Sequence, residues 1–260
     1  MNSEMISILA PAFCAGVLIS LTHVVLGQEV LKRGIIFLDL AVAQCAALGM
    51  MSFKLLTFID PYSFIGQYGV IGAGLCAALI CAFLFKALEK AQHFQEALIG
   101  CTFVLAASLS IMLTANAPHG AEDIKNILAG QILWTTWHDV WLCAPVFITL
   151  FLTWQFLPFF RTTLFYPLFA IAIPFAVNIM GVYLVFASLI FPALAVAQNA
   201  QHKTRDALLI SLLSYGLGLW ASSAFDWPSG PAIVLAMAML SAGYYLMSKN
   251  SGIKLFRRSK

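Results

Sequence analysis

Apolar runs of about 20 residues recur along the whole sequence and are separated by short polar or charged segments. A run of this length is what an α-helix needs to cross the hydrocarbon core of a bilayer. The chain is 62% hydrophobic and 10% charged, whereas soluble domains are about 45–50% apolar and about 25% charged. The sequence therefore predicts an all-α, polytopic transmembrane bundle that forms a single domain over residues 1–260. The spans are expected near residues 5–26, 34–56, 69–88, 96–116, 138–158, 164–180, 181–198, 207–224 and 230–247, which makes eight or nine depending on how the sixth and seventh are counted.

The longest uncharged segment, Leu164–Gln198, is too long for one straight crossing. Its roughly 35 residues would form a helix of about 52 Å, against a hydrocarbon core of about 30 Å. Arg161 and Lys203 flank the segment and are both expected on the cytoplasmic side, so the chain must turn back between them. The residues at which it can break are Pro167, Pro174, Asn178 and Gly181. The segment is therefore predicted to form two short spans or a re-entrant arrangement.

The positive charges decide between the two orientations of the bundle. With the N-terminus outside, only Lys54 and Lys125 of the 14 lysines and arginines fall outside, and the other 12 are cytoplasmic. Cytoplasmic loops of membrane proteins are enriched in Lys and Arg. The N-terminus is therefore predicted outside and the C-terminus in the cytoplasm. The cations are dispersed at span ends, so the net charge of +3 predicts no nucleic-acid partner.

One predicted span carries a carboxylate and an amide within its apolar run. The stretch LKRGIIFLDLAVAQCAALG, residues 31–49, opens with two cations and then places Asp39 and Gln44 in the membrane. An ionisable group at membrane depth costs at least about 2.5–3.5 kcal/mol and usually faces a substrate path or a partner group. No cation lies within one helical turn of Asp39 in its own span, which favours a path-lining role. The alternatives are pairing with a neighbouring helix and a position near the interface, from which the side chain reaches the polar headgroup region.

Further polar residues offer weaker candidate sites. His23 is the only histidine in a predicted span, and a lone helical histidine more often bonds a neighbour than a ligand. The outer segment 116–139 carries groups that could receive a metal ion, namely His119, Glu122, Asp123, His138 and Asp139. We favour an ordinary solvated loop over a metal site, with a surface helix that spans Ile124–Trp134. Beside it, Trp134, Trp137 and Trp141 are expected to form an interfacial aromatic belt.

The cysteines and the pairs of small residues are expected to be positions of helix packing. The six cysteines lie almost entirely within apolar runs and form no CxxC pair, so buried helix contacts are expected rather than disulfides or a zinc cluster. The small-residue pairs expected to bring helices together are Gly72/Cys76, Gly74/Ala78, Ala106/Ser110 and Ser214/Gly218. Glycine-rich phosphate loops, GxSxG and HExxH are absent from the sequence. We therefore expect a protein that is not an enzyme, binds no cofactor, and needs a partner subunit for any ATP-driven action.

Four stretches, in the same order, resemble the membrane permeases of ABC-type zinc, manganese and iron importers. They are LKRGIIFLDLAVAQCAALG, EALIGCTFVLAASLSIML, GVYLVFASLIFPALAVA and FDWPSGPAIVLAMAML. The last two are the more specific because of their proline and glycine spacing at Pro192, Asp226, Pro228, Gly230 and Pro231. The resemblance covers most of residues 15–245.

This resemblance implies a permease subunit that forms a homodimer in the bacterial inner membrane. It would receive a divalent metal ion, its substrate, from an extracytoplasmic metal-binding lipoprotein or periplasmic protein, and a cytoplasmic ATP-binding subunit would drive it. In relatives an Asp and a His four residues later hold metal in the pathway. The Asp corresponds to Asp39, whereas the His position falls on Ala43 or Gln44. A carboxylate with an amide favours manganese or magnesium over zinc, and His23 or Cys45 could supply a softer ligand.

The sequence departs from the resemblance at the fifth-to-sixth span connection. Relatives carry an acidic, alanine-rich cytoplasmic segment there that docks on the ATPase, whereas this chain has only about residues 159–163. Coupling would then move to the segment Gln198–Asp206, or the ATPase would be held differently. The alternative function is an ion- or proton-coupled secondary transporter with Asp39 as its protonatable group. Such carriers often contain inverted repeats, and no convincing repeat is visible here.

Overall fold

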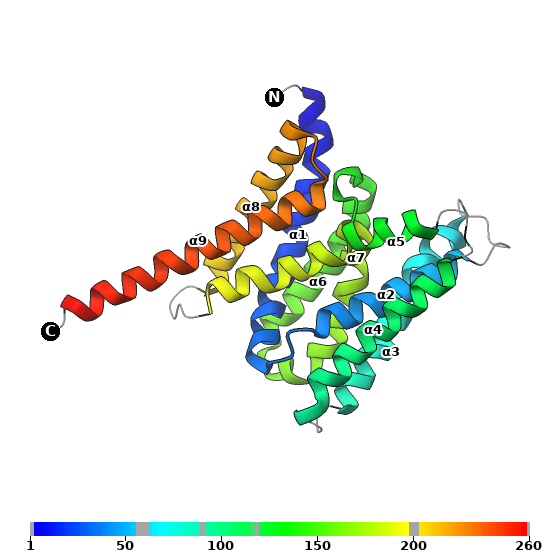
Figure 1. Ribbon diagram of the computed structural model, residues 1–260, viewed down its shortest axis with the longest axis horizontal. Coiled ribbons are helices and arrows are strands. Elements are labelled where there is room, and N and C mark those ends of the chain that lie inside the picture. The colour runs from blue at the N-terminus through cyan, green and yellow to red at the C-terminus, as the bar shows by residue number, and fades with distance from the viewer. Residues whose placement is uncertain are drawn as a thin grey trace.

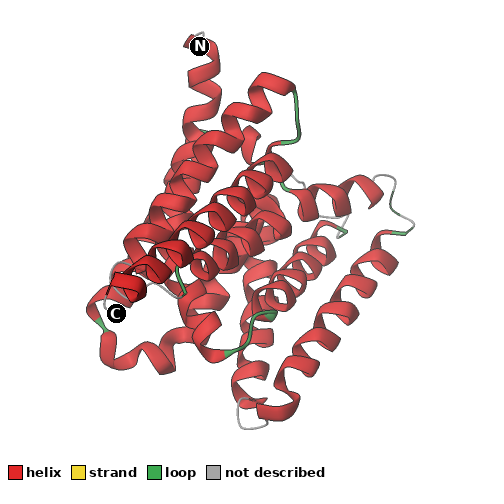
Figure 2. Cartoon of the chain, turned by 60° about the vertical axis from the view of Figure 1, so that its left-hand side comes forward, coloured by secondary structure: helices red, strands yellow, loops and turns green. Residues whose placement is uncertain are grey.

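The computed structural model describes residues 3–55, 63–88, 92–115, 117, 120–197 and 203–258, and every regular element in these ranges is helical (Figures 1 and 2). The α-helices are α1 Ser3–Arg33, α2 Leu38–Lys54, α3 Phe64–Leu88, α4 Gln92–Thr114, α5 Gly120–Ala129, α6 Trp137–Phe156, α7 Arg161–Ala195, α8 Lys203–Phe225 and α9 Ser229–Arg258. Two short 3₁₀ helices, η1 Ile132–Trp134 and η2 Pro158–Phe160, flank α6. The predicted all-α polytopic bundle is confirmed.

Seven of the described helices are long and apolar enough to cross a membrane, namely α1, α3, α4, α6, α7, α8 and α9. The remaining predicted span is α2, whose 17 residues extend about 26 Å, slightly less than the hydrocarbon core of about 30 Å. The predicted surface helix in the segment before α6 is present as α5 followed by η1. Most predicted boundaries fall within a few residues of the observed ones, and α1 continues further than expected, to Arg33.

Helix α7 is the centre of the bundle. It packs against α1, α2, α3 and α9, and its side chains are buried along most of its length. The helix is interrupted at Gly181, where φ is 76° and ψ is 167°, a backbone conformation that is essentially restricted to glycine. The predicted break between residues 180 and 181 is confirmed. Pro167, Pro174 and Asn178 lie in continuous helix, so the prediction that they help to break it is wrong. Membrane helices tolerate the loss of the hydrogen bond that a proline removes.

The two parts of α7 form a hairpin whose tip is Gly181. Arg161, at the start of α7, and Lys203, at the start of α8, line the same pocket, which confirms the predicted return of the chain. We call this end of the bundle the basic end. At the opposite end Gly181 lies against Gly130, where a Cβ atom on Gly181 would be only 2.3 Å from the backbone nitrogen of Gly130.

Small residues bring several helices together, although not all the predicted pairs do so. Gly74 of α3 lies against Ala46 and Met50 of α2, and Gly218 of α8 lies against the backbone of Ile233 in α9. Gly72, in contrast, has open space around it. Its predicted partner Cys76 is exposed, as is Cys101, so the expectation that these two cysteines are buried is wrong: they lie on outward faces of α3 and α4.

Gly27 provides a test of the packing between α1 and α7. A Cβ atom at Gly27 would lie 2.0 Å from the carbonyl oxygen of Leu189. Gly27→Ala should therefore separate the two helices and destabilise the fold by about 1–3 kcal/mol, seen as a lower midpoint of thermal unfolding in detergent. Gly72→Ala, in the open environment of α3, is the matched control and should leave the midpoint unchanged or higher. Equal midpoints for both variants would contradict the close α1–α7 contact.

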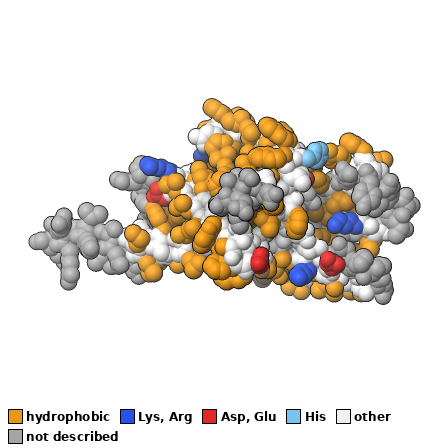
Figure 3. Space-filling model, turned by 90° about the horizontal axis from the view of Figure 1, so that it is seen from above, with side chains coloured by type: hydrophobic (Ala, Val, Ile, Leu, Met, Phe, Trp, Pro, Cys, Tyr) orange, Lys and Arg blue, Asp and Glu red, His pale blue; other side chains and the backbone are white. Residues whose placement is uncertain are grey.

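The outer surface of the bundle is predominantly apolar. Figure 3 shows hydrophobic side chains across much of the visible face, with few charged groups between them. Large exposed side chains on four helices contribute to this surface, including Ile80, Leu105, Leu213 and Met239. Trp134, Trp137 and Trp141 are also exposed, near the start of α6, where an interfacial aromatic belt was predicted. A surface of this kind is suited to lipid rather than to water.

Candidate functional site

Asp39 lies in the first turn of α2, where the chain has just reversed direction after α1. The turn uses Gly34 with φ 73°, and the helix begins without a side-chain cap. Asp39 is 1% exposed, and neither carboxylate oxygen has a hydrogen-bond partner among the described residues. Its position at the positive end of the helix dipole favours a negative charge. The carboxylate is therefore buried without a side-chain partner and remains able to bind a cation.

The face of α2 that carries Asp39 can be traced from its helical spacing. Ala43, Ala46 and Met50 follow Asp39 at four, seven and eleven residues, which places them on one stripe of the helix. Ala46 and Met50 of this stripe contact Gly74 of α3. Asp39 therefore points into the interior of the bundle, on the side of α2 that faces α3.

Gln44 does not share this stripe. It is five residues after Asp39, which corresponds to a rotation of about 140° around the helix axis, although it is also buried. Ala43 is the residue that lies one turn beyond Asp39 on the same side. Cys45 interacts with Cys81 of α3. Asp39 and Gln44 thus occupy one helix without converging on one face.

His23 is fully buried in α1. Its Nδ1 atom is 3.1 Å from the carbonyl oxygen of Ile19, and its Nε2 atom has no partner among the described residues. The ring lies 6.5 Å from that of Phe147 in α6, centroid to centroid. Helix α1 packs mainly against α6, α7 and α8, whereas α2 packs against α3, α4 and α7, so His23 and Asp39 belong to different parts of the helix bundle. No group of three or more His, Cys, Asp or Glu side chains suited to a metal ion is present in the described ranges.

The predicted outer cluster is only partly described, and one of its members has a structural role. Asp139 caps α6: its Oδ2 accepts hydrogen bonds from the backbone N–H of Thr136 at 2.8 Å and from the Thr136 hydroxyl at 2.7 Å. Glu122 is exposed and lines a shallow pocket between α4 and α5, and His138 is exposed at the start of α6. His119 lies outside the described residues, as does the side chain of Asp123.

The proline and glycine motif before the last helix forms the corner between α8 and α9. Asp226 has φ 53°, and the Ser222 hydroxyl donates a hydrogen bond of 2.7 Å to the carbonyl oxygen of Trp227. Pro228 accepts from the N–H of Ala232 at 3.1 Å. Pro231 lies in the first turn of α9, where its missing N–H has no partner to lose.

Close packing explains the remaining motif residues. Gly230 lies against α5, where a Cβ atom would be 2.3 Å from the carbonyl oxygen of Ala129. Pro192 is buried in the second part of α7 and accepts a hydrogen bond from Val196. In the structure these residues position helices.

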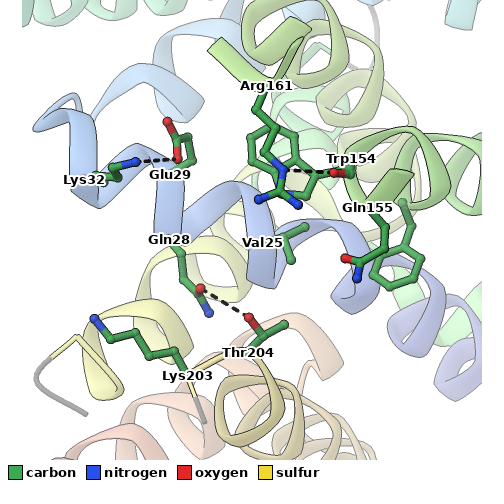
Figure 4. Close-up of a pocket in the computed structure, with 10 residues that line it drawn as sticks. Val25, Gln28, Glu29, Lys32, Trp154, Gln155, Arg161, Lys203 and Thr204 are labelled. Carbon is green, nitrogen blue, oxygen red and sulfur yellow. Dashed lines mark hydrogen bonds and ion pairs between the residues drawn. The ribbon is translucent and has the colours of Figure 1, made fainter. Parts of the chain in front are cut away.

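A pocket at the basic end was not predicted from the sequence. It has a volume of about 550 Å³ and is lined by Val25, Gln28, Glu29, Lys32, Phe151, Trp154, Gln155, Arg161, Lys203 and Thr204 (Figure 4). The lining residues come from α1, α6, α7 and α8. Glu29 pairs with Arg33 at 3.0 Å and with Lys32 at 3.9 Å. The sequence feature that could have indicated these ion pairs is the spacing of four residues between Glu29 and Arg33, which favours a salt bridge on one helix face.

Comparison with known proteins links this architecture to one family. The chain matches the ABC 3 transport family over residues 5–166 and 156–247. The two matched segments meet at 156–166, the same connection that is shorter than the resemblance implies. In the structure this connection consists of Leu157 and η2, and α7 begins directly after η2.

Individual relatives agree with the family match. The manganese transport system membrane protein MntC of Halalkalibacterium halodurans is 24% identical, with 95% of this chain and 89% of that protein aligned. The high-affinity zinc uptake system membrane protein ZnuB of Haemophilus influenzae is 25% identical over 91% of this chain and 96% of that protein. Among solved structures, PsaBC from Streptococcus pneumoniae in complex with Fab has the same fold, with a TM-score of 0.74, 20% identity and 95% of each chain covered. Because the family model matches nearly the entire sequence, the protein belongs to the ABC 3 transport family.

Proposed function

We propose that this chain is the membrane permease subunit of an ATP-binding-cassette importer that moves a divalent transition-metal ion, zinc or manganese, into the cytoplasm. The observation that carries the proposal is the carboxylate of Asp39, which is buried and has no hydrogen-bond partner. Leaving such a group unpaired inside an apolar bundle is costly, and a passing cation would remove that cost.

The path would run beside α2 and the hairpin of α7. Asp39 provides the negative charge, and Gln44 and His23 are candidate ligands at other depths of the pathway rather than members of one site. A transient site suits a conduit because an ion that binds tightly at several ligands would leave slowly. The family match favours this importer over a secondary transporter that uses Asp39 for protons.

The partners follow from the same proposal. Two copies of the chain would form the membrane unit, an extracytoplasmic metal-binding protein would deliver the ion, and a cytoplasmic ATP-binding subunit would supply the energy. With the N-terminus outside, the basic end faces the cytoplasm, as the distribution of Lys and Arg predicts. The ATPase would contact the short α6–α7 connection and the segment that leads into α8, and its coupling surface lacks the long docking segment of the relatives.

Reconstitution tests the energy source directly. The chain would be purified with a cognate ATPase and metal-binding protein, placed in liposomes, and assayed for uptake of Zn²⁺ and Mn²⁺. We expect uptake that requires ATP hydrolysis and the binding protein, and ATP hydrolysis that is stimulated by the loaded binding protein. Uptake driven by a proton gradient in the absence of ATP would contradict the proposal and favour the secondary transporter.

A further inference from the structure

The pocket at the basic end collects positive charge that the protein does not neutralise. Lys32, Arg161 and Lys203 line it together with a single carboxylate, Glu29. Arg33 already pairs with Glu29 at 3.0 Å. The described part of the chain shows no acidic partner for Arg161 or Lys203, and the undescribed residues just before Lys203 contain no Asp or Glu. The pocket therefore has an excess of cations.

The pocket also holds a neutral donor without an acceptor among the described residues. Gln28 uses its side-chain oxygen to accept a hydrogen bond from Thr204 at 3.4 Å, while its buried Nε2 atom has no partner among the described residues. The first residues of α7 and α8 border the same space, and the backbone N–H groups at helix N-termini favour anions. A ligand that fits these features is a negatively charged group with several oxygen atoms, because the pocket offers cations, an unpaired amide N–H and two helix N-termini.

The position of the pocket indicates the source of that group. It lies between the last turns of α1 and α6 and the first turns of α7 and α8, which is the level where spans leave the bilayer. Val25, Phe151 and Trp154 form apolar walls. Apolar walls beside basic side chains match a lipid headgroup with its attached glycerol better than an acidic protein segment.

We propose that this pocket binds the phosphate headgroup of an anionic phospholipid from the cytoplasmic leaflet. Figure 4 shows Arg161 beside Trp154, with Lys203 and Gln28 on the other side of Val25. The volume of about 550 Å³ lies within the range of about 300–1,000 Å³ typical of small-molecule sites. A lipid held there would bridge the basic ends of α1, α6, α7 and α8.

The test compares lipids and matched charge variants in the full-length protein. Detergent-solubilised protein would be incubated with phosphatidylglycerol, phosphatidylcholine or inorganic phosphate, and bound lipid would be counted by native mass spectrometry alongside thermal unfolding. We expect selective retention of phosphatidylglycerol and a rise of several degrees in the unfolding midpoint of the natural chain. K32Q/K203Q should lose most of both effects, whereas K54Q/K86Q, which removes the same charge away from the pocket, should retain them.

Arg161→Gln provides a second variant. It also removes the 3.0 Å hydrogen bond from Arg161 to the carbonyl oxygen of Trp154, so its unfolding midpoint in phosphatidylcholine measures the effect of losing that bond alone. Equal phosphatidylglycerol retention in K32Q/K203Q and K54Q/K86Q would overturn the proposal. So would an equal rise in midpoint with inorganic phosphate alone, which would indicate a site for free anions. If K32Q/K203Q retains lipid normally but no longer copurifies with the ATPase, the pocket belongs to the protein interface and the lipid proposal is wrong.

Discussion

Asp39→Asn should reduce metal uptake by the reconstituted importer roughly 10- to 100-fold at limiting metal concentration. Hydrogen bonds and contacts to a charged group are worth about 1.5–3 kcal/mol, and each 1.4 kcal/mol corresponds to about a tenfold change in an equilibrium constant. The amide keeps the size of the carboxylate but not its charge. Uptake of Zn²⁺ and Mn²⁺ into liposomes is the measurement, with the ATPase and binding protein held constant.

The same variant should not lose stability, and this separates a pathway role from a structural one. The carboxylate of Asp39 is buried without a partner, so replacing it with a neutral group removes a desolvation cost. The unfolding midpoint of Asp39→Asn should therefore equal or exceed that of the natural chain. Asp39→Glu, which retains the charge, is the control and should retain more uptake than Asp39→Asn. Normal uptake in Asp39→Asn would refute the pathway role, and a large fall in its midpoint would indicate a structural one.

Gly181→Ala should severely destabilise the protein, by about 3 kcal/mol or more, because two costs add at this position. The backbone conformation, φ 76° and ψ 167°, costs a residue with a side chain about 1–3 kcal/mol. The new Cβ atom would also lie 2.3 Å from the nitrogen of Gly130 and 2.9 Å from the carbonyl carbon of Ala129. Neither neighbour is a flexible side chain, so the hairpin tip must move away from α5.

Gly34 supplies the control for the backbone part of this effect. It also has a positive φ, 73°, but nothing lies within 4 Å of its Cβ position. Gly34→Ala should therefore show the cost of a positive φ without the collision. Unfolding midpoints and the yield of monodisperse protein in detergent measure both variants. If Gly181→Ala and Gly34→Ala are equally stable, the tip of α7 does not pack against α5 as described.

The positions of the spans and of the break in α7 could be predicted because they follow from lengths and charges. An uncharged segment longer than a bilayer, flanked by cations that belong on one side, must reverse. The sequence offered four residues at which α7 could break. Only the structure shows that the break is at Gly181 rather than at Pro167 or Pro174. Proline interrupts one hydrogen bond within a helix, whereas the observed backbone angles at Gly181 are accessible only to glycine.

Side-chain neighbours could not be predicted in the same way. Gly72 and Gly74 each begin a pair of small residues with equivalent spacing, but only Gly74 faces α2. The spacing identifies residues that permit a close approach without identifying which face has a partner. The basic pocket was missed because its residues come from four helices, and α1 is distant in the sequence from the other three. Asp39 was predicted to lie inside the bundle, but its missing hydrogen-bond partner is a property of the packed structure.

The contacts at the end of the molecule opposite the basic pocket limit how that surface can rearrange. Gly130, Gly181 and Gly230 leave no side chain between α5, the tip of α7 and the start of α9, so the three backbones touch. We therefore expect a displacement of the end of α5 to displace the other two segments with it. Both parts of α7 meet at this contact and extend away from it through the bundle, so we expect α7 itself to be the element that moves with α5.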